Sequence, residues 1–155
     1  MRLALLILVL AAGSVRAQKD GFPRDIVFAH NQIRAQVGVP PLAWSDHLGT
    51  IARDWANTLL SRREFSHRPN GKWGENLFTI TGARASSTEV IRVWADESRN
   101  YDYRSNRCRD VCGHYTQIVW RDTKQVGCAV ARDNRREIWV CNYDPPGNWV
   151  GRRPY

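Results

Sequence analysis

All four cysteines of this 155-residue chain lie in its last third, and they restrict how that part can fold: Cys108, Cys112, Cys128 and Cys141. Two segments around a polar turn, 124–132 and 137–144, are typical of β-strands. A two-residue loop at 134–135 places Cys128 directly opposite Cys141. Facing Cα atoms of an antiparallel pair lie about 4.5–5.5 Å apart, within reach of a disulfide. The pattern predicts a hairpin closed by a Cys128–Cys141 bridge, with Cys108 and Cys112 pairing locally.

The N-terminal segment indicates where the cell sends the protein. A basic start at Arg2 is followed by an apolar run over 3–12 and by small residues before and at Ala17. This is the pattern of a secretory signal peptide over 1–17, and the run is shorter than the roughly 20 apolar residues of a membrane anchor. We therefore expect a secreted, extracellular protein with one domain over 18–155. Export favours disulfides over the alternative, a zinc site built from the cysteines.

The charge balance bears on the partners of the protein. The chain has 23 basic and 15 acidic side chains, a formal charge of +8. A basic secreted protein can meet an acidic polysaccharide, an anionic membrane or another negatively charged partner, although a solubilising surface is the simpler explanation of the same charge. No nucleic-acid-binding motif is present, so we expect no nucleic-acid partner. A monomer is expected.

Hydrophobic periodicity predicts helices over 23–37, from Ser45 or Asp46 to about residue 59, over 86–98, and a short one over 116–120. A short strand is expected over 75–78. Helices segregated from an antiparallel sheet predict an α+β domain. Glu97 falls on the apolar face of the third helix, where a carboxylate needs a partner. His30, on the apolar face of the first helix, is interpreted as a structural histidine.

Several motifs occur in an order that a known family shares. Residues 113–120 read GHYTQIVW, 140–148 read VCNYDPPGN, 74–77 read GENL and 94–97 read WADE. Together they closely resemble the signatures of the CAP superfamily, and the ending PPGNWVGRRPY is most similar to the plant pathogenesis-related group 1 proteins. The resemblance implies a three-layer α-β-α sandwich. It also implies the disulfides Cys108–Cys112 and Cys128–Cys141.

The resemblance implies a cleft tetrad of His67, Glu75, Glu97 and His114. Two imidazoles and two carboxylates can hold a metal such as zinc, with His67 and His114 as ligands. They can also act as general acid and base, or form a hydrogen-bonded network. No nucleophile motif accompanies them, so no catalytic residue is assigned, no cofactor is required, and zinc is a possible ligand. Trp73 and Trp149 lie outside the periodic segments and could contact a ligand, although packing is the simpler interpretation.

The function implied by the resemblance is defence in the plant apoplast. Such a protein would be antimicrobial, and antifungal in particular, by binding sterols or other lipids. Two alternatives belong to different classes. The tail from Pro145 to Tyr155, expected to be exposed, could be released as a signalling peptide. The tetrad could instead serve a metal-dependent hydrolase.

Overall fold

The computed structural model describes residues 17–155, and the predicted signal peptide up to residue 16 lies outside the described residues. The elements are α1 (Ala17–Gln36), β1 (Ala43–Trp44), α2 (Asp46–Arg62), β2 (Gly74–Thr81), α3 (Ser87–Ala95), the 3-10 helix η1 (Asp96–Asn100), β3 (Tyr101–Asp102), β4 (Arg107–Cys108), α4 (Gly113–Ile118), β5 (Gln125–Arg132) and β6 (Arg136–Asp144). Within these residues, no helix combines the length and the apolar character that a membrane crossing requires.

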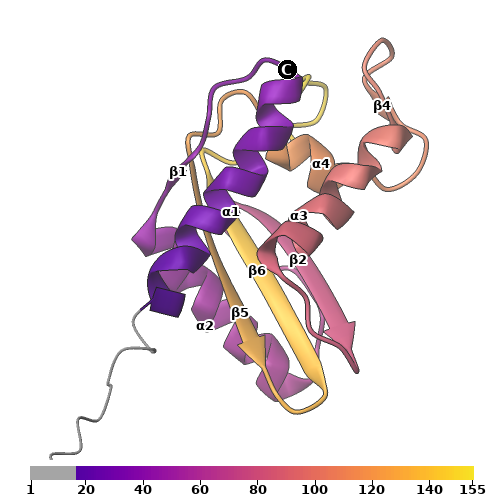
Figure 1. Cartoon of the computed structure of the whole chain (residues 1–155). Coiled ribbons are helices and arrows are strands. Elements are labelled where there is room, and N and C mark those ends of the chain that lie inside the picture. Colours follow the sequence, from indigo (N-terminus) through magenta and orange to yellow (C-terminus); the bar gives the residue numbers. More distant parts are fainter. Residues whose placement is uncertain (1–16) are drawn as a thin grey trace, which may run out of the picture.

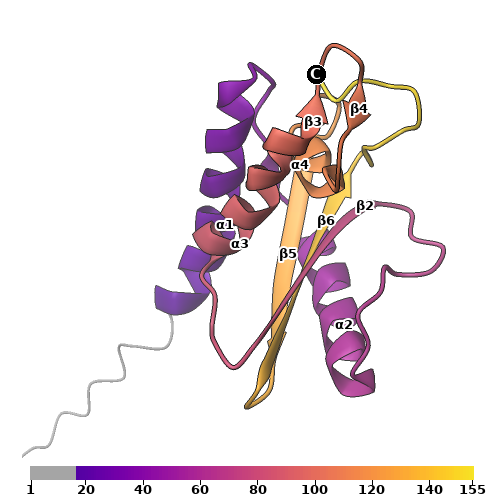
Figure 2. The same ribbon diagram turned by 90° about the vertical axis from the view of Figure 1, so that its right-hand side faces the viewer.

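A four-stranded sheet in the order β1-β5-β6-β2 forms the middle layer of the molecule. β1 runs parallel to β5, and the other pairs are antiparallel. Helix α2 covers one face, whereas α1 and α3 cover the other (Figures 1 and 2). Each face has its own buried cluster, with Leu59 and Ile138 in one and Trp94 and Trp139 in the other. The predicted α-β-α sandwich is therefore confirmed.

The β5–β6 hairpin has the predicted register. Cys128 faces Cys141, their Cα atoms are 4.1 Å apart, and the two are bridged. The turn has Asn134 and Arg135 at its centre, because the amide of Asp133 donates to the carbonyl of Arg136 at 3.0 Å. The second predicted bridge, Cys108–Cys112, is also present.

Side-chain caps explain where two of the helices begin. The Ser45 hydroxyl accepts from the amide of Leu48 at the start of α2. At α3 the Ser86 hydroxyl accepts from the amide of Glu89, and the Glu89 carboxylate accepts from the Ser86 amide, which is a capping box. The predicted third helix is continuous to 98, whereas the structure ends α3 at Ala95 and continues as η1.

The short fourth helix lies earlier than predicted, over Gly113–Ile118 rather than 116–120. Buried Arg34 of α1 explains its end. The guanidinium donates to the carbonyls of Ile118 at 2.7 Å and Trp120 at 2.9 Å. These carbonyls are therefore held by α1, and the chain turns away from the helical path after Ile118.

The C-terminal tail is exposed over most of its length but is fixed at its end. Residues 148–153 are exposed, as predicted, whereas Pro154 is buried and Tyr155 is half-buried. The Tyr155 ring stacks on Tyr103 with centroids 4.9 Å apart, and the amide of Arg121 donates to the carbonyl of Pro154 at 2.7 Å. The end of the tail is thus part of the folded domain.

Candidate functional site

Two residues of the predicted tetrad, His67 and Glu75, join the segment after α2 to the start of β2. His67 Nδ1 lies 2.8 Å from Glu75 Oε1, which also accepts from the amide of Arg68 at 3.0 Å. The Arg68 side chain is tied to α2, because its guanidinium donates to the carbonyl of Ile51 and lies over the ring of Trp55. The Glu75 side chain is nearly buried, whereas that of His67 is 65% exposed.

Electrostatics in this pair favour the charged imidazole. The hydrogen bond that His67 donates to the Glu75 carboxylate raises the pKa of His67 above its ordinary value, and partial burial opposes that effect. A protonated His67 next to this carboxylate forms a partly exposed ion pair, which is worth little stability.

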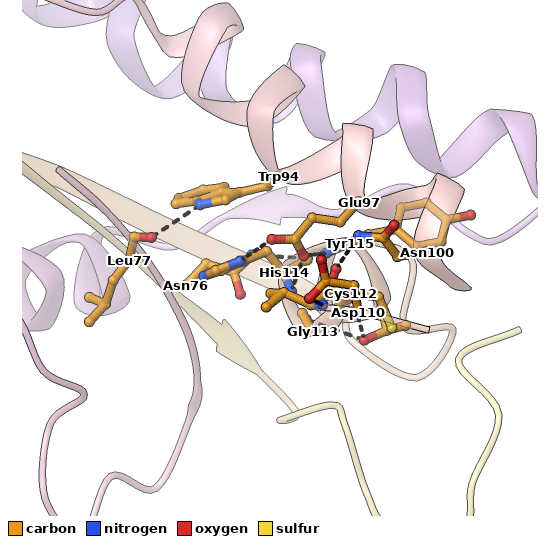
Figure 3. A network of polar contacts seen from close by, with 12 residues as sticks. Asn76, Leu77, Trp94, Glu97, Asn100, Asp110, Cys112, Gly113, His114 and Tyr115 are labelled. Atoms are coloured by element: carbon orange, nitrogen blue, oxygen red, sulfur yellow. Dashed lines mark hydrogen bonds and ion pairs between the residues drawn. The ribbon is translucent and has the colours of Figure 1, made fainter. Parts of the chain in front are cut away.

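The second pair ties η1 to α4 (Figure 3). His114 Nδ1 lies 2.6 Å from Glu97 Oε1, and Glu97 Oε2 accepts from the amide of His114 at 3.0 Å. The ring of His114 stacks on Trp94 with centroids 5.8 Å apart, and Trp94 is itself held by a bond to the carbonyl of Leu77. Glu97 therefore has the partner that its place on the apolar face required.

The two pairs are linked through strand β2. Glu75 lies beside Asn142, and both share the face of the sheet that α2 covers. The next residue of β2, Asn76, points to the other face, where its side-chain amide donates to the carbonyl of His114 at 3.1 Å. Each histidine is thus bonded to one glutamate, and a single cleft formed by all four side chains stays a prediction.

A hollow of about 200 Å³ opens at the first pair. It is lined by His67, Arg68, Gly71, Trp73, Glu75 and Asn142. Sequence reasoning named Trp73 as a residue that could contact a ligand, but it did not name Arg68 or Asn142. Asn142 lies in the VCNYDPPGN motif, so its place in that motif was the available signal.

The donors present are of the kind that zinc accepts, and a carboxylate bonded to one ring nitrogen is the arrangement that orients metal-ligating histidines. His67 and His114 would each offer Nε2. Among residues 17–155, however, no three His, Cys, Asp or Glu side chains gather into a set that could hold a metal ion. A structural zinc site has four ligands. Zinc binding by His67 and His114 therefore stays a prediction.

Comparison with known proteins places this geometry in a family. A sequence model of the CAP family, described as the cysteine-rich secretory protein family, matches residues 27–143. The chain belongs to the CAP family. Both His–Glu pairs of this CAP protein lie within the matched residues.

The relatives of this CAP protein include plant proteins. Pathogenesis-related protein 1 of Arabidopsis thaliana is 42% identical over 154 residues, which cover 97% of this chain and 94% of that protein. The basic form of pathogenesis-related protein 1 of Nicotiana tabacum is 42% identical over 144 residues, covering 92% of this chain and 79% of that protein. The solved structure of venom allergen-like protein 4 of Schistosoma mansoni is 27% identical, with a TM-score of 0.67 over 86% of this chain and 92% of that one.

Proposed function

We propose that this CAP protein is a secreted plant defence protein that restrains microbes by binding sterols or related lipids. The observation that carries the proposal is the 42% identity to pathogenesis-related protein 1 over nearly the whole of both chains. A likeness of that extent covers nearly the whole domain rather than a single motif.

An apolar ligand needs a hollow with apolar walls, and the α1 side of the sheet supplies candidates. Two hollows, of about 310 and 470 Å³, share Phe22 of α1 and Val130 of β5 in their walls. Trp44 lines the first and Trp139 the second. Both volumes fall within the range of about 300–1,000 Å³ that is usual for ligand pockets. The walls also include charged side chains, among them Asp46 and Arg53 in the first hollow and Asp25 and Arg132 in the second.

Phe22 lines both hollows. Its ring lies 5.8 Å from that of Trp139 and 6.3 Å from that of Trp44, measured between centroids. Because the two hollows share Phe22 and Val130, we call them together the α1–β5 groove. This supports the α1–β5 groove as the sterol site and leaves the His–Glu pairs outside it.

The test is equilibrium binding of radiolabelled sterol to purified residues 18–155. Val130→Arg places a charge in the shared wall and is expected to weaken binding at least about tenfold, because a buried unpaired charge is strongly disfavoured. Val93→Arg is the matched control, since Val93 lies on α3 and is exposed. The double variant His67→Ala, His114→Ala and an excess of zinc should leave binding unchanged.

The outcomes separate the alternatives. Saturable binding that only Val130→Arg weakens supports a lipid-binding defence protein with a structural role for the His–Glu pairs. Absence of sterol binding by the unmodified protein would contradict the proposal. Binding that is lost with the histidines or restored by zinc would move the site to the His–Glu pairs.

A further inference from the structure

One end of the molecule combines exposed apolar side chains with a high density of arginine. It consists of residues 99–112, which include the β3–β4 hairpin, and of residues 145–155, and we call these two segments the tip. The tip lies at the end of the sandwich opposite the β5–β6 turn (Figures 1 and 2). Neither His–Glu pair nor the α1–β5 groove includes a residue of the tip.

The exposed apolar side chains are concentrated in the tip. Four of the seven large apolar residues that are exposed within 21–155 lie there: Tyr103, Val111, Trp149 and Val150. Scattered exposed apolar residues are normal, whereas a group at one end of a molecule indicates an interaction surface.

The turn of the tail explains why Val150 projects. The amide of Arg152 donates to the carbonyl of Trp149 at 3.0 Å, and Gly151 between them has a φ of +79°. These are the features of a tight turn with glycine in its third position, which leaves Val150 at the apex and fully exposed. Trp149 is 55% exposed, and its indole is held by a bond from Nε1 to the carbonyl of Pro146.

The two segments of the tip are held together, so that they form one surface. The side chain of Asn106 donates to the carbonyl of Arg152 at 3.2 Å, and that of Asn148 donates to the carbonyl of Gly113 at 2.9 Å. The guanidinium of Arg153 lies over the ring of Tyr103, 5.0 Å from its centroid. Val111 is fixed by Asn100, whose side-chain amide donates to the Val111 carbonyl at 2.8 Å.

The charge of the tip is strongly positive. Its side chains include two aspartates and six arginines. The arginines are all exposed: Arg99, Arg104, Arg107, Arg109, Arg152 and Arg153. Both aspartates are engaged within the tip, because Asp102 accepts from the amide of Arg104 and Asp110 from that of Val111. The tip therefore combines exposed apolar side chains with exposed guanidinium groups, one of which, that of Arg152, is paired with Asp122 at 2.8 Å.

We propose that the tip is a docking surface for lipid bilayers that carry anionic headgroups. Apolar side chains at an interface enter the headgroup region, while basic side chains beside them bind the anionic lipid. Tryptophan and tyrosine favour that interface, because one part of each ring system is apolar and one atom is polar. Docking through the tip requires no sterol, and it is independent of the proposed function.

An acidic polysaccharide would also be attracted by the arginines, but it would not explain the aliphatic side chains. The side chains of Val111 and Val150 have no hydrogen-bonding group, and a partner that covers them removes apolar surface from water, which is favourable. A bilayer covers such side chains, whereas a hydrated polyanion does not. The combination of charge with exposed valines therefore favours the membrane.

The test is flotation with sterol-free vesicles of phosphatidylcholine alone and of phosphatidylcholine with one quarter phosphatidylglycerol. The unmodified residues 18–155 should bind the anionic vesicles at least about tenfold better, and this preference should fall at high salt. Val150→Asp should weaken binding to anionic vesicles about fivefold or more although all six arginines are retained, because it removes the aliphatic side chain and adds one negative charge. Arg104→Glu combined with Arg107→Glu should weaken it at least about tenfold, since each basic side chain contributes about fivefold.

The matched control is Arg62→Glu combined with Arg135→Glu, which makes the same change in charge at the opposite end of the molecule. Both residues are exposed, at the end of α2 and in the β5–β6 turn. The control should bind anionic vesicles more tightly than Arg104→Glu with Arg107→Glu. Equal loss in both double variants, or normal binding by Val150→Asp, would overturn the proposal. Binding to polygalacturonate but not to anionic vesicles would also overturn it.

Discussion

His30 shows how one buried side chain makes the whole domain sensitive to acid. It is fully buried, with Nδ1 2.8 Å from the carbonyl of Ile26 and Nε2 2.9 Å from the hydroxyl of Tyr143. This arrangement suits a neutral ring that donates through Nδ1 and accepts through Nε2. Burial lowers the pKa of His30 from 6.5 to about 4. The interpretation of His30 as a structural histidine is confirmed.

The sign of the pH effect follows from this lowered pKa. Between pH 6.5 and 4 the unfolded chain binds a proton at His30 that the folded chain does not bind. The contribution of His30 to the free energy of unfolding should therefore be fully present above about pH 6.5. It should be lost on acidification, by about 2 kcal/mol between pH 7 and 5. Urea titrations should show a smaller acid loss for His30→Gln and an unchanged loss for His47→Gln, an exposed histidine. An equal acid loss in both variants would contradict the prediction.

Arg34 is a second buried titratable side chain of α1, and unlike His30 it is charged. Besides Ile118 and Trp120, it donates to the carbonyls of Pro40 at 2.7 Å and Thr123 at 3.1 Å. Burial lowers the pKa of Arg34 to about 10, so the group stays protonated at neutral pH. A planar fork of five donors suits four separate acceptors, whereas the compact ammonium of lysine does not.

Replacement of Arg34 by lysine should consequently leave buried carbonyls without partners. We expect Arg34→Lys to lower the free energy of unfolding by about 3–5 kcal/mol, as breaking a buried charged network does. The exposed Arg53→Lys should change it by less than about 0.5 kcal/mol. Urea or thermal unfolding measures both, and a similar small change in both variants would show that the four carbonyls find other donors.

At the scale of elements, Glu97 joins η1 to α4. Its carboxylate accepts from His114 Nδ1 and from two amides at the start of α4, those of His114 and Tyr115. A negative charge is stabilising at this end of a helix, and a carboxylate accepts stronger hydrogen bonds than a neutral amide does. The turn from α3 to the tip therefore depends on this one side chain.

Glu97→Gln should lower the free energy of unfolding by about 1–3 kcal/mol, because one accepting oxygen is replaced by a donor. Glu89→Gln is the control: it makes the same exchange in the exposed capping box of α3, where glutamine can also serve, and should lower the free energy of unfolding less than Glu97→Gln does. Chemical denaturation at pH 7 compares them. A larger effect at Glu89 than at Glu97 would refute the assignment.

At the scale of the whole molecule, the C-terminal tail over 145–155 is packed against the sandwich. Its residues are bonded to the body at several places besides Tyr155. The carbonyl of Pro145 accepts from the Thr123 hydroxyl, the amide of Gly147 donates to Gln117 Oε1, and Asn148 Oδ1 accepts from the Thr116 hydroxyl. A cut after Asp144 would break one peptide bond and leave these contacts in place.

We therefore expect a chain that is cut after Asp144 to retain residues 145–155 under native conditions. Gel filtration of the nicked protein should show the fragment eluting with the body, and release should occur only in denaturant. Tyr155→Ala should speed release, because it removes the stacking on Tyr103. Immediate loss of the fragment from the native nicked protein would contradict this expectation and would favour the tail as a free signalling peptide.

Much of the fold was predictable because local chemistry determines it. The two-residue loop set the hairpin register, so the Cys128–Cys141 bridge followed from counting along the chain. Serine caps marked where α2 and α3 begin. The ends of helices were predicted less well, since α4 ends where Arg34, 84 residues earlier in the chain, takes the carbonyl of Ile118. No local pattern contains that contact.

By itself, the sequence determined the family, the disulfides and the inward place of Glu97, because periodicity, caps and motif spacing act over short stretches of chain. The three layers followed from the family resemblance. Only the tertiary structure decided that His67 pairs with Glu75 and His114 with Glu97. It alone also decided that the tail is packed against Tyr103 and that arginines from two segments form one tip. These features depend on contacts between residues far apart in the chain, which form only when the sheet brings both partners to the same place.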